Sequence, residues 1–413
     1  MAINPEYHIL SNGIRLVHIP TLSPVAHLGV FINTGSRDEP EGQDGMAHFI
    51  EHMIFKGTRK RKAYHILNRL ESVGGELNAF TTKEYTCLYT SFLNTWYSRA
   101  AELLSDIIFN STFPAREMKK EKDIIIEEIN SYLDTPSEQI YDDFESALFN
   151  GHTMGRSILG SPNQVKSFKH RDITSFFRNC YGTDRMVICS VGGVSFPRFV
   201  KYIEKYFGEE PRKSHLNKRK APANYKQFHQ EKERKTYQSH SIIGNRAYAR
   251  DHKHRFTFGL LNNILGGPGL NSRLNMMVRE KYGYAYSIDS FYYPYSDTGV
   301  WGIYLGTHNG TSEKAIKLVL RELKRLQEVK LGNLQLSQAK KQYRGQIAIA
   351  FDSNINVMLS GGRSCMHDHH LLSVEEIYKK IETVNTTDLM EVANEIFYPE
   401  HLSTLTYKAS WNS

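Results

Sequence analysis

Apolar and polar residues alternate along two early segments of the chain, which is the pattern of strands with one buried face. Between residues 44 and 55 apolar side chains instead recur every three or four positions, as in an amphipathic helix, and Asp44 is placed to cap its start. The elements predicted up to the first long acidic helix are strands at residues 13–19, 26–33, 76–82 and 85–92, and helices at residues 44–55, 63–73, 95–110 and 115–133.

The second half of the chain repeats this order of elements. A strand and a helix, at residues 185–194 and 196–207, lead into a basic stretch rich in Pro, Asn and Lys. Beyond it we predict strands at residues 239–243, 284–293 and 300–307, with helices at residues 256–265 and 270–281 and long helices afterwards. The fold class is therefore predicted as α+β, with two homologous domains from an internal duplication, each an antiparallel-rich sheet packed with helices. The predicted parts are residues 1–210, a basic linker at residues 211–228, and residues 229–413.

Composition supports a folded chain of more than one core. The 413 residues exceed one ordinary hydrophobic core, and 40% hydrophobic with 23% charged residues excludes a fibrous or disordered protein. The net charge of +8 lies largely in runs at residues 56–62 and 212–220, which favour a solvated face or linker. Because residues 212–220 have no aromatic side chains among the basic ones, nucleic acid is not an expected partner.

The four cysteines and the chain's first residues bear on its compartment. The cysteines are scattered without a CxxC pair, which fits a reducing environment. Residues 1–13 lack the features of a secretory leader, and no run of eighteen apolar residues occurs. We therefore expect a cytoplasmic protein that has no membrane partner.

The predicted helix at residues 44–55 contains a pair of histidines four positions apart. On a helix, His48 and His52 share one face and can both bind one cation, for which zinc is the natural choice. A catalytic zinc keeps one position open for water, and Glu51 is placed beside that position as a general base. The pattern predicts a metal-dependent hydrolase.

A third ligand has to come from elsewhere in the chain. The acidic helix at residues 115–133 carries Glu121 and Glu128, seven positions apart and hence on one face. One of them can bind the metal while the other accepts a hydrogen bond from a metal-bound histidine.

The segment His48-Phe49-Ile50-Glu51-His52 resembles the inverted zinc motif H-x-x-E-H of the inverzincin peptidases, the family of pitrilysin, insulin-degrading enzyme and the mitochondrial processing peptidase. The resemblance covers nearly the whole chain and is closest to the short, processing-peptidase-like branch. It implies one zinc ion per chain, held by His48, His52 and Glu128, with Glu51 as the catalytic base. Glu121 matches the second glutamate of the family, and we include it among the catalytic residues.

Residues 74–82 resemble the edge strand to which the family's substrates add as a further strand. The resemblance implies that Asn78, Ala79 and Phe80 bind substrate. Such binding requires an extended peptide and makes few demands on its side chains.

Two more residues match the family in the second half of the chain, after the segment at residues 265–274. Arg279 and Tyr286 keep the family's spacing of seven, which implies that Tyr286 donates to the developing oxyanion and that Arg279 holds the substrate backbone. In the family these residues and the zinc belong to opposite halves of a closed shell. The resemblance therefore implies a homodimer in which Arg279 and Tyr286 act in trans.

The predicted function is a zinc metalloendopeptidase that hydrolyses peptides or unstructured protein segments, bound in extended form within a dimeric chamber. Two alternatives are a catalytically silent scaffold or assembly subunit, and a subunit that is active only with a different partner chain. A histidine cluster, His367, His369 and His370, is interpreted as a polar loop, although closely spaced histidines can also bind metal.

Overall fold

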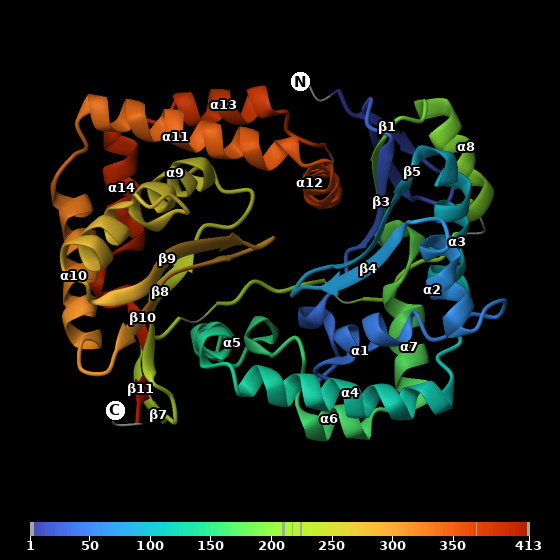
Figure 1. The fold of residues 1–413 in the computed structure, drawn as a ribbon, viewed down its shortest axis with the longest axis horizontal. Helices are drawn as coiled ribbons and strands as arrows, with labels where there is room; N and C mark the ends of the chain where they lie inside the picture. Colours follow the sequence, from blue (N-terminus) through green and yellow to red (C-terminus); the bar gives the residue numbers. More distant parts are fainter. Residues whose placement is uncertain (1–3, 209–210, 217, 224, 369, 411–413) are drawn as a thin grey trace. The chain divides into compact units, whose positions relative to one another are not determined.

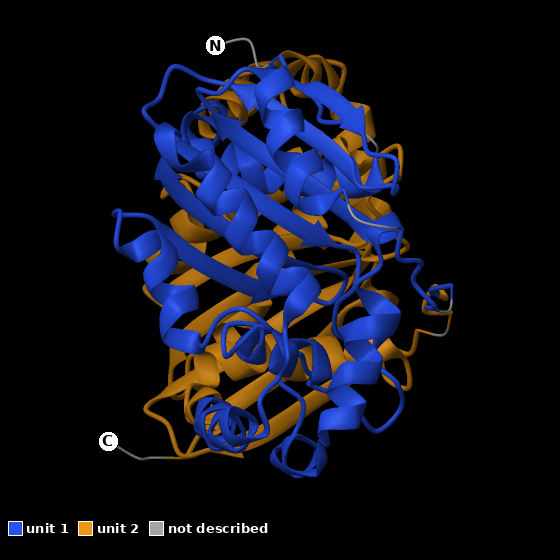
Figure 2. Ribbon diagram, turned by 90° about the vertical axis from the view of Figure 1, so that its right-hand side faces the viewer, with its two compact units in different colours: residues 1–129, 156–219, 348–374 blue, residues 130–155, 220–347, 375–413 orange. Residues whose placement is uncertain are grey.

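The computed structural model describes residues 4–208, 211–216, 218–223, 225–368 and 370–410 (Figure 1). These residues form two compact units, each assembled from three separate segments (Figure 2). Unit 1 comprises residues 1–129, 156–219 and 348–374, and unit 2 comprises residues 130–155, 220–347 and 375–413. Each unit has its own sheet and its own hydrophobic core.

Unit 1 is built on a six-stranded sheet in the order β1-β2-β6-β3-β5-β4. Its strands are β1 (Glu6–Ile9), β2 (Arg15–Pro20), β3 (Val25–Ile32), β4 (Glu76–Thr81), β5 (Thr86–Leu93) and β6 (Met186–Gly192). All neighbouring strands are antiparallel except β2 and β6, which are parallel. Because β4 has only β5 beside it, one side of its backbone is available for another strand.

Most helices of unit 1 cover one face of this sheet. They are α1 (Met46–Met53), α2 (Ala63–Glu71), α3 (Tyr97–Asn110), α4 (Ala115–Leu133), α6 (Pro162–Ser167), α7 (His170–Cys180) and α8 (Phe196–Phe207). The apolar side of α3 packs with Leu28, Val30 and Leu88 of the strands in a fully buried core. About 25 cal/mol is gained for each Å² of apolar surface removed from water, so this packing fixes the helices against the sheet.

Unit 2 is built on a five-stranded sheet in the order β7-β11-β8-β10-β9. Its strands are β7 (His229–Arg234), β8 (Gln238–Ala247), β9 (Ala285–Pro294), β10 (Gly299–His308) and β11 (Ser403–Ala409). The pair β7 and β11 is parallel and all other pairs are antiparallel, which repeats the arrangement of β2, β6, β3, β5 and β4 in unit 1. The α+β class with two similar domains is thus confirmed, and the matching strand order is what a duplication produces.

One face of the second sheet is covered by helices of the same half of the chain. The helices that contribute to this core are α9 (Arg255–Gly266), the π-helix η5 (Asn275–Lys281), α10 (Ser312–Glu328), α11 (Asn333–Asp352), α13 (Val374–Glu382) and α14 (Thr386–Ile396). Trp301 and Ile303 of β10 and Phe258 of α9 are fully buried in this core. Short 3-10 helices occur at Ser36–Asp38, Asn94–Trp96, Thr153–Gly155, Thr183–Arg185 and Pro399–His401.

The opposite face of each sheet is covered by one helix from the other half of the chain. Helix α12 (Asn354–His367) packs Val357 and Met358 onto Phe31 of the first sheet. Helix α5 (Pro136–Leu148) packs its apolar side onto the second sheet, where Phe144 joins a buried cluster. The two halves of the chain therefore exchange a helix, so each compact unit is discontinuous in sequence, whereas the predicted parts, residues 1–210 and 229–413, are contiguous.

The basic stretch after α8 is attached to unit 1. Arg212 lies over the ring of Phe109 at 5.4 Å, and Arg219 pairs with Asp38 at 2.6 Å. The unit includes this stretch as far as residue 219. Its two arginines therefore stabilise unit 1, in contrast to the solvated linker predicted from charge alone.

Candidate metal centre

The helix that carries the two histidines starts at Met46, two residues later than predicted. Its N-cap is Gly45, at φ 93°, and no side chain of that residue caps it. Instead the buried carboxylate of Glu39 accepts the N–H groups of Gly45 and Ala47, at 3.0 and 2.8 Å. The prediction that Asp44 caps the helix is wrong, because the carboxylate that does so comes from an earlier turn. Burial raises the pKa of Glu39, although the two N–H donors oppose this rise.

His48, His52 and Glu128 lie together in unit 1. Each offers one ligand atom, and these three atoms lie within 4.8 Å of one another. Nε2 of His48 is 3.7 Å from one oxygen of Glu128, and Nε2 of His52 is 3.4 Å from the other. The two imidazole rings are 4.7 Å apart, as expected for residues one helical turn apart.

Glu121 lies on the far side of His52 from Glu128. Its Oε2 is 3.2 Å from Nδ1 of His52, and its Oε1 is 2.7 Å from Nζ of Lys56. The side chain of Glu121 is 4% exposed and that of Glu128 is 45% exposed. The geometry therefore distinguishes the two glutamates, which the sequence pattern left open: Glu128 faces both histidines, and Glu121 orients His52.

The electrostatics of the group are those of a cation site. Burial and the neighbouring His52 lower the pKa of His48 to about 4. Burial also disfavours the charged form of His52, but Glu121 and Glu128 outweigh it and raise that pKa to about 9. Hydrogen bonding to His52 lowers the pKa of Glu128. A proton on Nε2 of His52 thus lies where a metal ion can bind, between that nitrogen and the carboxylate of Glu128.

The donor set fits zinc. Two imidazole nitrogens and one carboxylate oxygen are the ligands of a catalytic zinc that keeps a position for water, and a carboxylate on the remote nitrogen of a histidine is its usual support. Among the residues that the structure describes, no other three metal-binding side chains come together. His369 of the predicted histidine cluster lies outside the described residues.

Glu51 points from the same helix toward the edge of the sheet. Burial raises the pKa of its carboxyl, and the neighbouring Thr81, at the end of β4, opposes this rise. His52 and Glu128 are close enough to affect the same group. Glu51 therefore lies between the candidate metal ligands and strand β4.

The three predicted substrate-binding residues lie in the middle of β4. Asn78 is exposed, whereas Ala79 packs against the helical core. Phe80 lies on Tyr85 and Tyr89, with ring centroids 5.8 and 6.1 Å away. Since β4 is an edge strand, its backbone is available to an added strand, while the side chain of Phe80 also helps to hold the sheet.

Both halves of the chain are similar in sequence to known proteins. The profile described as insulinase, peptidase family M16, matches residues 17–162, and that described as the M16 inactive domain matches residues 167–343. The uncharacterized zinc protease YmxG of Bacillus subtilis is 33% identical over 95% of this chain and 96% of its own length. This chain belongs to the M16 peptidase family. The predicted family and the assignment as a zinc peptidase are thereby confirmed.

Other M16 proteins extend the comparison. A probable beta subunit of the mitochondrial processing peptidase from Schizosaccharomyces pombe is 30% identical over 96% of this chain and 90% of its own. A crystal structure of an M16 inactive domain from Pseudomonas fluorescens has the same fold, with a TM-score of 0.91 at 19% identity, over 100% of this chain and 99% of that one. The M16 fold of this chain therefore spans both units.

Arg279 and Tyr286 lie in unit 2 on backbone of irregular geometry. Arg279 belongs to the π-helix η5, whose turns contain one more residue than an α-helix. Tyr286 is the extra residue of a β-bulge in β9, because Gly306 and Thr307 of β10 pair with Ser287 and Ala285. Both irregularities are frequent at functional sites, since each redirects a side chain.

The side chains of this pair are open to solvent. Tyr286 is 50% exposed, and its ring contacts that of His308 at 4.5 Å. The side chain of Arg279 is 46% exposed and has only Glu280, at 3.9 Å, as an ion partner among the described residues. Both groups are thus free to contact a ligand.

The sequence analysis did not identify three residues near these groups, His308, Lys56 and Glu39. Of these, Lys56 lies four positions after His52, a helical spacing that could have indicated its place beside the site.

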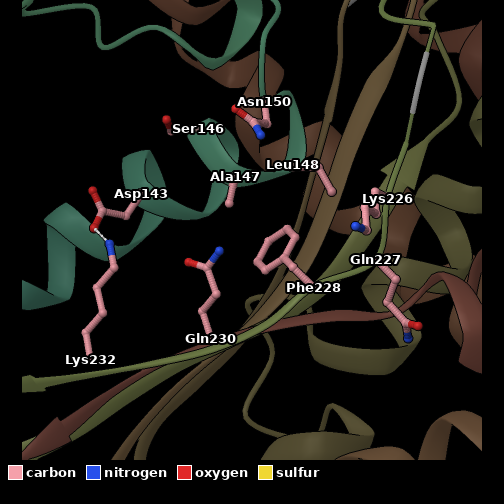
Figure 3. Close-up of a pocket in the computed structure, with 10 residues that line it drawn as sticks. All are labelled: Asp143, Ser146, Ala147, Leu148, Asn150, Lys226, Gln227, Phe228, Gln230 and Lys232. Atoms are coloured by element: carbon pink, nitrogen blue, oxygen red, sulfur yellow. Dashed lines mark hydrogen bonds and ion pairs between the residues drawn. The ribbon is translucent and has the colours of Figure 1, made fainter.

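A cavity of about 630 Å³ in unit 2 is separate from all of these residues (Figure 3). It lies between α5 and the segment that leads into β7, with Phe228 at its side. Lys232 spans it to reach Asp143 at 2.6 Å, and that carboxylate also accepts a bond from Tyr407. The cavity lacks the titratable cluster of a catalytic site.

None of the helices in the described part of the chain combines the length and apolar character needed to cross a membrane.

Proposed function

We propose that this M16 chain is a zinc-dependent endopeptidase that cleaves peptides or unstructured protein segments bound in extended form. One observation carries the proposal: the ligand atoms of His48, His52 and Glu128 lie within 4.8 Å of one another, beside the half-buried Glu51 and an edge strand. It is supported by two relatives that match nearly the whole chain and are named as zinc proteases.

The chain's own residues divide the chemistry among them. His48, His52 and Glu128 would hold one zinc ion, which when bound polarises the scissile carbonyl and acidifies water. The carboxylate of Glu51 takes the proton of the attacking water and passes it to the leaving amine. Glu121 accepts from Nδ1–H of His52, so that Nε2 of that ring keeps a lone pair for the metal.

Strand β4 supports the proposed form of the substrate. A peptide that adds to its free edge forms backbone hydrogen bonds along Asn78, Ala79 and Phe80, next to the helix that carries Glu51. Backbone pairing needs an extended chain, so folded proteins should resist cleavage. The substrate class is accordingly flexible peptide segments of varied sequence.

A homodimer in which Arg279 and Tyr286 act in trans is part of the proposal. The metal-binding residues belong to unit 1, and this pair belongs to unit 2, where both side chains are open to a ligand. The phenol of Tyr286 can donate to a developing oxyanion, and the guanidinium of Arg279 can bind substrate carbonyls. A catalytic subunit that requires a different partner chain is the alternative.

Metal analysis combined with a cleavage assay tests the function. We expect about one zinc per purified chain and cleavage of a mixed pool of unstructured peptides, both lost with a chelator and in His48→Ala. Zinc without cleavage would indicate a missing partner chain. A chain that binds no divalent metal would refute the proposal.

A further inference from the structure

A lysine that the metal motif does not include is bound to the site's second carboxylate. Nζ of Lys56 lies 2.7 Å from Oε1 of Glu121, and Oε2 of the same carboxylate lies 3.2 Å from Nδ1 of His52. The other nitrogen of that imidazole faces Glu128. Lys56, Glu121 and His52 therefore form a continuous chain of polar contacts that ends at the candidate metal position.

The two ends of the Lys56–Glu121 contact lie on different helices. The N–H of Lys56 donates to the carbonyl of Met53 at 3.0 Å, so this lysine continues directly from the last turn of α1. Glu121 lies on α4, two turns before Glu128 on the same face. The contact between Lys56 and Glu121 thus joins the end of α1, which carries the two histidines, to α4, which carries Glu128. It fixes the position of α4 along α1.

Among the residues that the structure describes, no second buried carboxylate supports a histidine of the site. Nδ1 of His48 is buried without a hydrogen-bond partner in the described part of the chain, so His52 alone has a carboxylate on its remote nitrogen. That carboxylate is buried, whereas Glu128 is half exposed. If Lys56 were removed, a buried carboxylate would lose its cationic partner and be held by a single donor.

We propose that Lys56 is a positioning residue of the metal site. By holding Glu121, it fixes the orientation of the His52 imidazole and the position of Glu128 relative to the two histidines before a divalent cation binds. The proposal rests on the proposed function, because it takes these residues as the zinc site. It assigns Lys56 no contact with metal or substrate.

Zinc affinity tests the proposal without any assay of hydrolysis. Competition with a chromophoric chelator should give a zinc dissociation constant about 10- to 100-fold higher for Lys56→Met than for the natural chain. Lys56→Arg, which keeps a cation, should retain most of the affinity. Lys60→Met is the matched control, since Lys60 is exposed and follows on the same loop, and it should leave the affinity unchanged.

A double variant separates positioning from a general effect of charge. In a Glu121→Gln background, Lys56→Met should change the affinity less than about 2-fold, because its partner is already gone. An unchanged affinity in Lys56→Met would overturn the proposal, and so would an equal loss in both backgrounds. Thermal unfolding in excess chelator checks that each variant folds; should Lys56→Met fail, Lys56→Gln replaces it and has to show an intermediate loss.

The result is independent of catalysis. A chain that binds zinc, loses affinity in Lys56→Met and cleaves no peptide would support the role of Lys56 and refute the proposed peptidase. A chain that cleaves peptides and keeps its zinc affinity in Lys56→Met would support the proposed peptidase and refute the role of Lys56.

Discussion

The same stretch of fold occurs in both units, with different chemistry on each copy. In unit 1 it runs from β3 through α1 and α2 to the edge strand β4, and in unit 2 from β8 through α9 and η5 to the edge strand β9. The candidate metal ligands His48 and His52 lie on the first helix of one copy, whereas Arg279 lies on the second helical segment of the other and Tyr286 on its edge strand. Duplication has supplied one framework for two complementary sets of side chains.

The two copies also differ in how they fix those side chains. The first is regular: α1 is a standard helix, β4 pairs with β5 without a bulge, and Glu121 and Glu39 hold the site from buried positions. The second is irregular, with a π-helix and a bulge, and its key groups are exposed. Buried hydrogen-bonded groups suit a metal that needs fixed ligands, and redirected exposed groups suit a ligand that arrives from outside.

Removing Glu51, the proposed proton acceptor of the first copy, should have the largest effect. Glu51→Gln should lower kcat/KM by about 10²- to 10⁴-fold, because a general base contributes that much, while zinc content stays at the natural level. Peptide cleavage and metal analysis on the same sample measure both. Glu127→Gln, a change at an exposed glutamate of α4, is the control. Full activity of Glu51→Gln would show that Glu51 is not the general base.

Removing the hydroxyl of Tyr286, the proposed oxyanion donor of the second copy, should have the next largest effect. Tyr286→Phe should lower kcat by about 10²- to 10³-fold, as loss of one oxyanion donor does, with unchanged zinc affinity. Tyr293→Phe, on the same strand, serves as control. If the loss appears in KM alone, Tyr286 binds the ground state and is not the proposed oxyanion donor.

The helix exchange can be tested at a single glycine. A Cβ at Gly362 of α12 would lie 2.0 Å from the buried ring of Phe31, so Gly362→Ala should lower the free energy of unfolding by about 1–3 kcal/mol. Gly345→Ala, in α11 with open space around the glycine, should instead raise it by up to about 1 kcal/mol. Denaturant unfolding of both variants gives the comparison. Equal stability of the two would mean that α12 does not lie closely on this sheet.

Mixing two inactive variants tests whether the Glu51 and Tyr286 of one active site belong to the same chain or to two chains. Glu51→Gln mixed with Tyr286→Phe should recover about a quarter of the activity after subunit exchange, since half of the dimers then contain one intact pair. The separate variants under the same exchange conditions are the controls. Absence of recovery, with exchange verified, would contradict action in trans.

The sequence predicts the regular copy better than the irregular one. Periodicity finds the helices and strands around His48 and His52, and the spacing of Glu121 and Glu128 places both on one face of α4. It predicts an ordinary helix at residues 270–281, because a π-helix and an α-helix differ by one residue per turn, too little to alter the apolar pattern over two turns.

Long-range contacts account for the remaining differences. Glu39 rather than Asp44 caps α1, and Lys56 supports Glu121, through contacts that no local pattern contains. Strand β7 was not predicted because His229–Arg234 contains no apolar residue, and β1 because the alternation in Glu6–Ile9 spans only four residues. Strand β11, whose partners come from distant segments, was also not predicted. The helices α5, α6 and α7 were likewise not predicted.

The exchange of α5 and α12 has a consequence for the order of events during synthesis. The first sheet is complete once β6 has emerged, but the helix that covers Phe31 and its neighbours follows about 160 residues later, at Asn354–His367. At about 5–20 residues per second, this apolar face waits roughly 10–30 seconds for its cover. Meanwhile α5, already made, has no second sheet to pack on. A nascent chain of this protein should therefore need protection from aggregation, and translation stalled near residue 220 should leave it bound to a chaperone.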